Sequence, residues 1–336
     1  MNACSTIRAD SSVEQPLRWP KWPWLVLAIL AVVESVWLAA TPLSLATSTL
    51  VALLPIGCFS TVALLVASRV PVGGRLHCLL AGGAWLLVAW PILRLFNHLT
   101  MTTAFPLADV TLARWDAVLG FNWVAYARWV DQHPLLLRAM AVCYGGLTGY
   151  SCLLFVLLAF GKHPFARCRE MITLFLVTAL ACSTIGMLFP ALAALEHYRP
   201  AADTFQYIGP NTGLYHLQIL NSLRTNPTHV FALDSLPGLV TFPSFHTAMG
   251  VIAIYCARGT PWLLGPSLVI NLLMIASTPV LGSHYAIDVI AGATLASAAI
   301  LALRVAKRGT SGASSNNTCR TRQGWVWFPS GGPLPT

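Results

Sequence analysis

Long, uninterrupted apolar runs constrain this chain more than any other feature of its sequence. An α-helix of about 20 apolar residues crosses the ~30 Å hydrocarbon layer of a bilayer, and in lipid such a run must be helical to satisfy its backbone hydrogen bonds. The sequence therefore predicts an all-α fold, a polytopic membrane helical bundle of about eight transmembrane helices. The apolar runs cover residues 22–41, 43–68, 76–99, 135–160, 171–190, 238–257, 260–277 and 284–303.

Composition excludes a water-soluble domain. Hydrophobic residues make up 56% of the chain and charged residues only 9%, whereas soluble proteins carry roughly 25% charged residues. The net charge of +9 does not indicate nucleic-acid binding, because no basic cluster is interleaved with aromatic residues. The nine cysteines are scattered without a Cys-x-x-Cys pair and are expected to be small core residues.

The positions of Lys and Arg predict how the chain crosses the membrane, because basic residues near helix ends remain cytoplasmic. With the N-terminus inside, both termini are cytoplasmic, and two long segments, about 100–134 and 191–237, lie outside. The first apolar run is longer than a signal-peptide core and is expected to be retained as a helix. The basic residues that this orientation places inside are Arg18, Lys21, Arg69, Arg75, Lys162, Arg167, Arg169, Arg258, Arg304, Lys307 and Arg308.

Two short motifs place ionisable groups at the outer mouths of expected membrane helices. They are Thr-Phe-Pro-Ser-Phe-His-Thr at 241–247 and Gly-Ser-His-Tyr-Ala-Ile-Asp at 282–288. Ionisable residues are costly in a membrane and indicate function there. Because the orientation rests on Lys and Arg alone, the placement of both motifs on one side independently supports a shared site.

The second of these motifs contains a candidate nucleophile. His284 and Asp288 are four residues apart, which on a helix places them on one face within hydrogen-bonding reach. A carboxylate on one ring nitrogen fixes the tautomer and leaves the other nitrogen free to attack an electrophile such as phosphorus. We therefore expect His284 to be the nucleophile and Asp288 to orient it.

The first motif suits an anion and a proton donor. Pro243 and Ser244 are typical of a helix start, with proline in the first turn and serine as the cap. Helix N-termini attract phosphate, so Ser244 and the nearby amides would hold the group under attack. His246 could then protonate the departing oxygen.

Two other interpretations of these residues remain open. A single histidine in a membrane is often only an interhelical hydrogen-bond partner. A metal site is the chemical rival, because imidazole and carboxylate side chains also bind divalent ions. No HExxH or Cys/His pattern supports it, so no metal and no cofactor are expected. The ligands of such a site would be His284, Asp288, His246 and His216.

The two motifs resemble the second and third signature motifs of the type 2 phosphatidic acid phosphatase superfamily. The second reads Pro-Ser-Gly-His, matched here by Pro243 to His246, and the third ends in His-x-x-x-Asp, matched by His284 to Asp288. The form Pro-Ser-Phe-His-Thr-Ala with Gly-x-His-Tyr-x-x-Asp is most similar to the branch that contains inositol phosphorylceramide synthases and related bacterial proteins. The resemblance covers about 135–305.

This resemblance implies a helical bundle with a catalytic core of six helices. It also implies that His284 attacks, that Asp288 assists it, that His246 donates the proton and that Ser244 contacts phosphate. The chain departs from the family at two phosphate-binding cations. Thr278 stands where the family usually has arginine, and Leu192 stands where it has lysine.

Phosphoryl transfer needs positive charge on the phosphate oxygens, so other residues should replace the missing cations. The outer segment before the sixth apolar run offers Arg199, Arg224 and His216. Each could equally be a surface group that faces lipid headgroups. Arg94, near the outer end of the third run, is a weaker candidate, because snorkelling to the interface explains it.

The expected function is that of a lipid phosphatase or phosphotransferase in the bacterial inner membrane. A lipid phosphate or phospholipid is the expected substrate, and water, inositol or another alcohol is the acceptor of the phosphoryl group. A histidine-based transporter or proton relay, or an inactive scaffold on the same fold, are the alternatives. The expected organisation is a cytoplasmic N-terminal tail (1–21), N-terminal transmembrane helices with an outer loop (22–134), the phosphatase-like membrane core (135–305) and a flexible cytoplasmic C-terminal tail (306–336).

Overall fold

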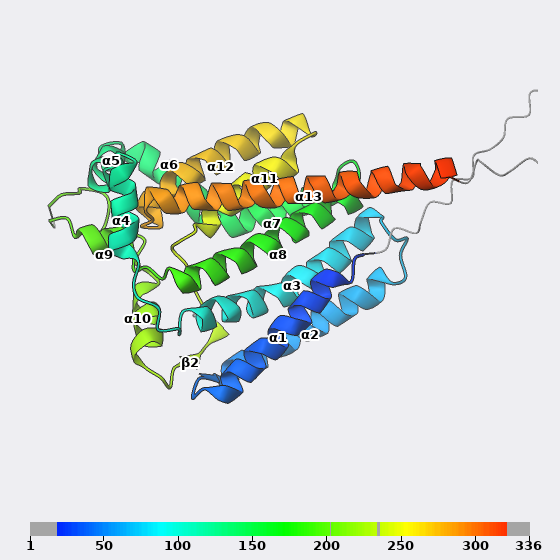
Figure 1. The fold of residues 1–336 in the computed structure, drawn as a ribbon, viewed down its shortest axis with the longest axis horizontal. Coiled ribbons are helices and arrows are strands. Elements are labelled where there is room, and N and C mark those ends of the chain that lie inside the picture. Colours follow the sequence, from blue (N-terminus) through cyan, green and yellow to red (C-terminus); the bar gives the residue numbers. More distant parts are fainter. Residues whose placement is uncertain (1–18, 202, 234–235, 321–336) are drawn as a thin grey trace, which may run out of the picture.

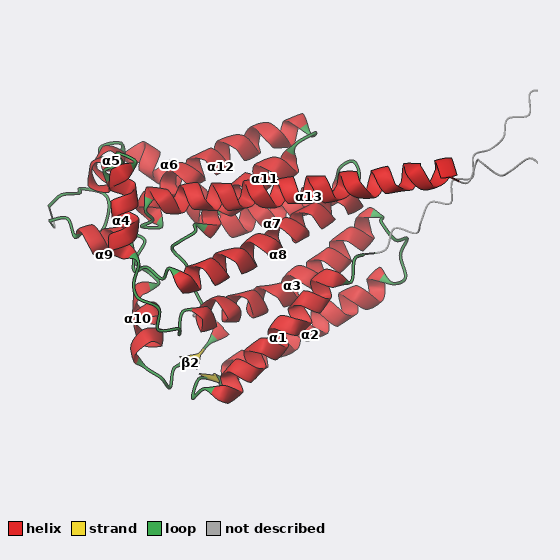
Figure 2. Cartoon of the chain, in the orientation of Figure 1, coloured by secondary structure: helices red, strands yellow, loops and turns green. Residues whose placement is uncertain are grey.

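The protein is an all-α bundle, which confirms the predicted fold class (Figures 1 and 2). The computed structural model describes residues 19–201, 203–233 and 236–320. The two-residue strands β1 (Ser44–Leu45) and β2 (Val230–Phe231) pair in parallel. The helices within the described ranges are α1 (Trp22–Ala40), α2 (Thr47–Ala67), α3 (Arg75–Thr100), α4 (Asp109–Val118), α5 (Trp123–Asp131), α6 (Pro134–Gly145), α7 (Leu147–Phe160), α8 (Pro164–Leu188), α9 (Ala194–Tyr198), α10 (Leu217–Thr225), α11 (Phe245–Ala257), α12 (Pro261–Leu281) and α13 (Ala286–Arg320).

Every expected apolar run contains helix, although two runs differ from a single straight span. Among the described residues, six helices are long and apolar enough to cross a membrane, or seven if α6 and α7 count as one bent span. The run 238–257 becomes helical only at Phe245, so α11 is a shorter apolar helix. Proline disfavours the helical conformation of the residue before it, so Pro237 and Pro243 oppose a helix that continues through these positions.

The bend between α6 and α7 measures 59° and lies at Gly146. A Cβ atom at this position would lie 2.8 Å from the carbonyl oxygen of Val142, which is closer than real Cβ contacts. Glycine therefore permits the tight junction that turns this span.

The bundle has two distinct ends. Helices α4, α5, α9 and α10 gather at one end, whereas α1 begins and α13 ends at the other (Figure 1). Helices α3 and α8 are the most buried of the long apolar helices. In α2, by contrast, only 11% of an apolar 18-residue stretch is buried inside the bundle. The exposed apolar side chains of α1 and α2 suit contact with lipid, because they would be unfavourable in water.

An ion cluster ties the helices together at the end away from α4. The carboxylate of Glu170 in α8 accepts hydrogen bonds at 3.0 Å from Arg258, which follows α11, and at 2.6 Å from Lys307 in α13. Helix α13 continues beyond this contact to Arg320, so part of the expected tail 306–336 is helical. Residues 1–18 and 321–336 of the two expected tails lie outside the described residues.

Helices α11 and α13 meet closely where the two motifs come together. A Cβ atom at Gly292 in α13 would lie only 2.2 Å from the carbonyl oxygen of Ser244. The absence of a side chain at Gly292 therefore sets the distance between the two helices. The backbone N–H of Ser244 also donates to the carbonyl oxygen of Asp288 at 3.0 Å.

We predict that Gly292→Ala forces α13 away from α11 and lowers the free energy of unfolding by about 1–3 kcal/mol, the usual cost of overpacking. Unfolding in detergent measures the effect. Gly57→Ala in α2 is the matched control, because a Cβ atom there has nothing within 4 Å. Equal losses from the two substitutions would contradict the prediction.

Candidate active site

The two sequence motifs line one cavity of about 760 Å³. Its walls are mainly apolar side chains of α3, α7 and α8, and its polar residues come from six separate parts of the chain. The volume is in the range of ordinary small-molecule and cofactor sites. The polar and ionisable lining residues are Arg94, Asn97, Thr148, Ser151, Cys152, Cys182, Ser183, Tyr215, His216, Thr241, His246 and His284.

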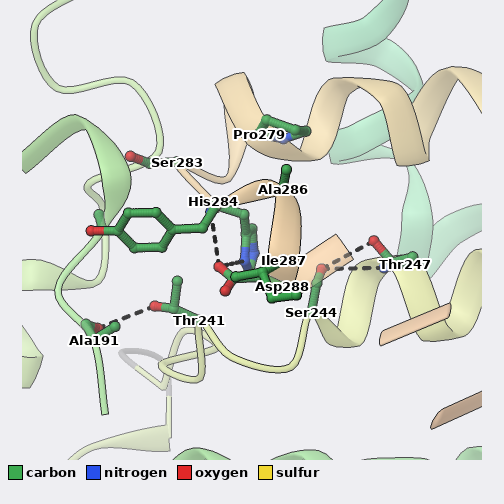
Figure 3. Close-up of polar contacts among 12 residues, drawn as sticks. Ala191, Thr241, Ser244, Thr247, Pro279, Ser283, His284, Ala286, Ile287 and Asp288 are labelled. Atoms are coloured by element: carbon green, nitrogen blue, oxygen red, sulfur yellow. Dashed lines mark hydrogen bonds and ion pairs between the residues drawn. The ribbon is translucent and has the colours of Figure 1, made fainter. Parts of the chain in front are cut away.

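His284 and Asp288 form the expected pair (Figure 3). The Nδ1 atom of His284 lies 3.1 Å from Oδ2 of Asp288, and both residues are buried. His284 itself lies in the turn before α13 rather than on the helix. The contact forms because Asp288, in the first turn, points back and also accepts a 2.9 Å hydrogen bond from the backbone N–H of Tyr285, as in a capping box.

The first motif begins α11, as its Pro-Ser sequence predicts. Ser244 is the N-cap, and its Oγ accepts hydrogen bonds from the backbone N–H and the hydroxyl group of Thr247, both at 3.3 Å (Figure 3). Ser244 is fully buried and does not line the cavity, so its role as a phosphate contact stays a prediction. His246 does line the cavity, with its ring stacked on Tyr144 at 4.3 Å between centroids.

Among the candidate cations of segment 191–237, His216 reaches the cavity. Its Nε2 lies 2.7 Å from the carbonyl oxygen of Leu192, and the side chain is buried. The backbone of Leu192, which stands where the resemblance implies a lysine, thus holds the ring of His216. Thr278, at the arginine position, is buried and donates to its own helix at the carbonyl oxygen of Met274.

The structure separates Arg199 and Arg224 from the cavity. Arg199 pairs with Glu196, and 74% of its side chain is exposed. Arg224 donates to the backbone carbonyl oxygens of Thr103 and Phe105 and so fastens α10 to the segment after α3. Neither side chain lines the cavity that holds His284 and His246, so the expected phosphate contacts of Arg199 and Arg224 stay predictions.

Arg94, which the sequence offered only as a weaker candidate for a phosphate-binding cation, does line the cavity. Its Nη1 donates a 2.9 Å hydrogen bond to the carbonyl oxygen of Leu236, which turns the guanidinium inward. Asn97, one turn later, accepts a hydrogen bond from the N–H of Leu239 at 3.0 Å and also lines the cavity. The C-terminal end of α3 thus supplies polar groups that the motifs alone did not indicate.

Buried carboxylates outside the motifs position the His284 turn. Asp116 accepts 2.8 Å hydrogen bonds from the backbone N–H groups of Ala286 and Ile287, the first two residues of α13. Asp109 accepts a 2.9 Å hydrogen bond from the Tyr285 hydroxyl. The two carboxylates are seven residues apart on one face of α4, a spacing that could have indicated a shared buried role.

The described residues contain no group of three or more His, Cys, Asp or Glu side chains that could hold a metal ion. The metal site considered from the sequence therefore has no geometric support within these ranges. Of its four suggested ligands, His284 and Asp288 contact each other, and His246 and His216 line the cavity with His284.

Burial sets the protonation of two histidines in the loops. Burial lowers the pKa of His284 to about 4, although the backbone of Thr241 opposes the shift. Burial also lowers the pKa of His216. His284 is therefore neutral at pH 7, the form in which an imidazole nitrogen can act as a nucleophile.

We predict that His284 remains neutral at pH 5, where an ordinary histidine is mostly protonated. Its ring should take up a proton only as the pH falls through about 4. Nuclear magnetic resonance of the ¹⁵N-histidine-labelled protein would follow the titration, with His284→Ala identifying the signal. A midpoint at the unperturbed histidine value would contradict the prediction.

Comparison with known proteins agrees with this geometry. A family model described as PAP2 superfamily matches residues 110–302, more than half of the chain. The match contains both motifs and begins in α4, before the expected start of the resemblance at 135, so it includes Asp116. No curated protein and no solved structure matches the chain. The apolar helices make the chain an integral membrane protein, and the family match shows that it belongs to the PAP2 superfamily, a superfamily of phosphatases and phosphotransferases.

Proposed function

We propose that the protein removes or transfers the phosphoryl group of a membrane lipid through a phosphohistidine formed on His284. The observation that carries this proposal is the cavity, which combines His284 and His246 with long apolar walls. A polar headgroup and its acyl chains need such a combination, because charge and hydrocarbon are accommodated by different surfaces.

The cavity also reaches the apolar outer surface of the bundle. Leu87 and Trp90 of α3 and Val156 of α7 line the cavity and are 46%, 42% and 39% exposed. A substrate could therefore enter sideways from the bilayer between α3 and α7 without leaving the hydrocarbon. This route supports a lipid rather than a water-soluble phosphate as the substrate.

The proposed reaction has two half-reactions. Asp288 accepts a hydrogen bond from Nδ1–H of His284, which leaves the Nε2 lone pair free. In the first half-reaction Nε2 attacks phosphorus, and the bond between phosphorus and the leaving oxygen breaks. His246 protonates that oxygen as it departs. Water or an alcohol then attacks the phosphohistidine, loses its proton to His246 and restores the Nε2 lone pair. Water yields a phosphatase, and an inositol or another alcohol yields a phosphotransferase.

The inositol phosphorylceramide synthase-like branch is part of the proposal. The motif form supports it, and so does the loss of the family cations at Thr278 and Leu192. We further propose that residues 135–305 form the core, that the site faces away from the cytoplasm in a bacterial inner membrane and that both termini are cytoplasmic. The balance of Lys and Arg supports this orientation.

We predict that His284→Ala lowers phosphate release from dioleoyl phosphatidic acid by at least about 10⁴-fold, because the nucleophile is lost. His246→Ala should lower it by about 10²–10⁴-fold, the usual contribution of a general acid. Purified protein in mixed micelles, with and without inositol as acceptor, gives both rates. An acid-labile phosphoenzyme should form in the wild-type protein and not in His284→Ala.

His133→Ala is the matched control, because His133 is an exposed histidine outside the cavity. It should retain wild-type activity. Full activity in His284→Ala would refute the phosphohistidine mechanism. Ion or proton flux that depends on His284, without any turnover of lipid phosphate, would instead favour the transporter.

A further inference from the structure

We propose that Arg94 forms the phosphate-binding subsite of this cavity and takes a phosphate oxyanion of the substrate. The inference rests on the proposed function and goes beyond it, because Arg94 lies in α3, outside the segment 110–302 that matches the family. It assigns the missing positive charge to α3, a helix that contains neither motif.

The cavity holds one permanent cation among its described lining residues. Arg94 is the single Arg or Lys side chain in that lining, alongside the histidines at 216, 246 and 284. His284, which is neutral at pH 7, adds no charge there. Since transferring a phosphoryl group requires positive charge on its oxygens, Arg94 is the group that can supply it.

The guanidinium of Arg94 has no carboxylate partner among the described residues. Within those ranges the ion pairs of arginine involve Arg167, Arg199 and Arg258, and none involves Arg94. To the described part of the chain the guanidinium donates one hydrogen bond, to the carbonyl oxygen of Leu236, whereas a guanidinium has five N–H donors. An uncompensated cation at membrane depth is costly, so an anion in the cavity would stabilise it.

The position of Arg94 differs from that of a snorkelling side chain. A snorkelling arginine extends to the headgroup region and leaves its charge in water. Arg94 instead lines the same cavity as His284 and His246 and bonds to the segment before α11. The planar fork of a guanidinium suits two oxygens of one phosphate, which a lysine would bind only as a point charge.

The test uses the full chain in mixed micelles with dioleoyl phosphatidic acid, and compares Arg94→Gln with Arg94→Lys. Arg94→Gln should lower kcat/KM by about 10²–10³-fold, as does the loss of one charge-stabilising donor in other enzymes. Arg94→Lys should recover part of this loss, because it keeps the charge without the fork. Arg199→Gln is the matched control and should retain wild-type activity, because its guanidinium is exposed and outside the cavity.

Binding of inorganic phosphate provides a second readout that does not depend on turnover. Phosphate should raise the unfolding temperature of the wild-type protein, of Arg199→Gln and, more weakly, of Arg94→Lys, but not of Arg94→Gln. Wild-type kcat/KM in a folded Arg94→Gln protein, or undiminished stabilisation of that protein by phosphate, would overturn the subsite.

The two proposals fail differently. If the wild-type protein forms no phosphoenzyme, the proposed function fails, and the phosphate titrations still decide whether Arg94 binds an anion. If a phosphoenzyme forms on His284 equally fast with and without Arg94, only the subsite is overturned.

Discussion

The candidate site depends on buried carboxylates that accept backbone N–H groups. Asp109 and Asp116 of α4 and Asp131 at the end of α5 each bind amides of a different segment of the chain. An unpaired amide in a low-dielectric region is costly, and a charged acceptor forms a stronger hydrogen bond than a neutral one. These contacts hold loop segments and the first turn of α13 in place, where the amides have no partner within a helix.

The contacts of Asp109 show how this works. Its carboxylate accepts from the N–H groups of Leu192 and Ala193, at distances from 3.0 to 3.3 Å, and from the hydroxyl of Tyr285 at 2.9 Å. The carbonyl oxygen of Leu192 in turn contacts His216, and Tyr285 follows His284 in the chain. One buried carboxylate therefore fixes both the segment that carries His284 and the segment whose backbone contacts His216.

The sequence predicted the helices and the His284–Asp288 contact because both follow from local spacing. Apolar runs of bilayer length specify helices whatever their neighbours are, and a residue at the third position of a helix can reach back to the preceding turn. The apolar run alone began too early, at residue 238, because the residues before Phe245 are apolar although their backbone is not helical, whereas the Pro243-Ser244 motif placed the helix start correctly. The sharp bend at Gly146 was missed because the hydropathy of a run does not show whether the helix axis changes direction within it.

The cations were the least predictable part of the site. Arg199 and Arg224 are close to the motifs in sequence, but their guanidinium groups are bound by Glu196 and by backbone carbonyl oxygens. Arg94 is some 150 positions from His246, and only the packing of α3 against the rest of the bundle places both on one cavity. Such a contact depends on tertiary structure, which neither the spacing of residues nor a signature motif encodes.

The contribution of α3 to the cavity wall affects how relatives of this protein are to be compared. The signature motifs lie in a segment that begins at residue 110, yet much of the surface that a substrate would touch comes from residues 79–97. Two proteins with identical motifs could therefore differ in the lipids they accept. Selection for a new substrate could alter α3 while leaving the histidines unchanged, so a classification by motif alone would group enzymes of different specificity.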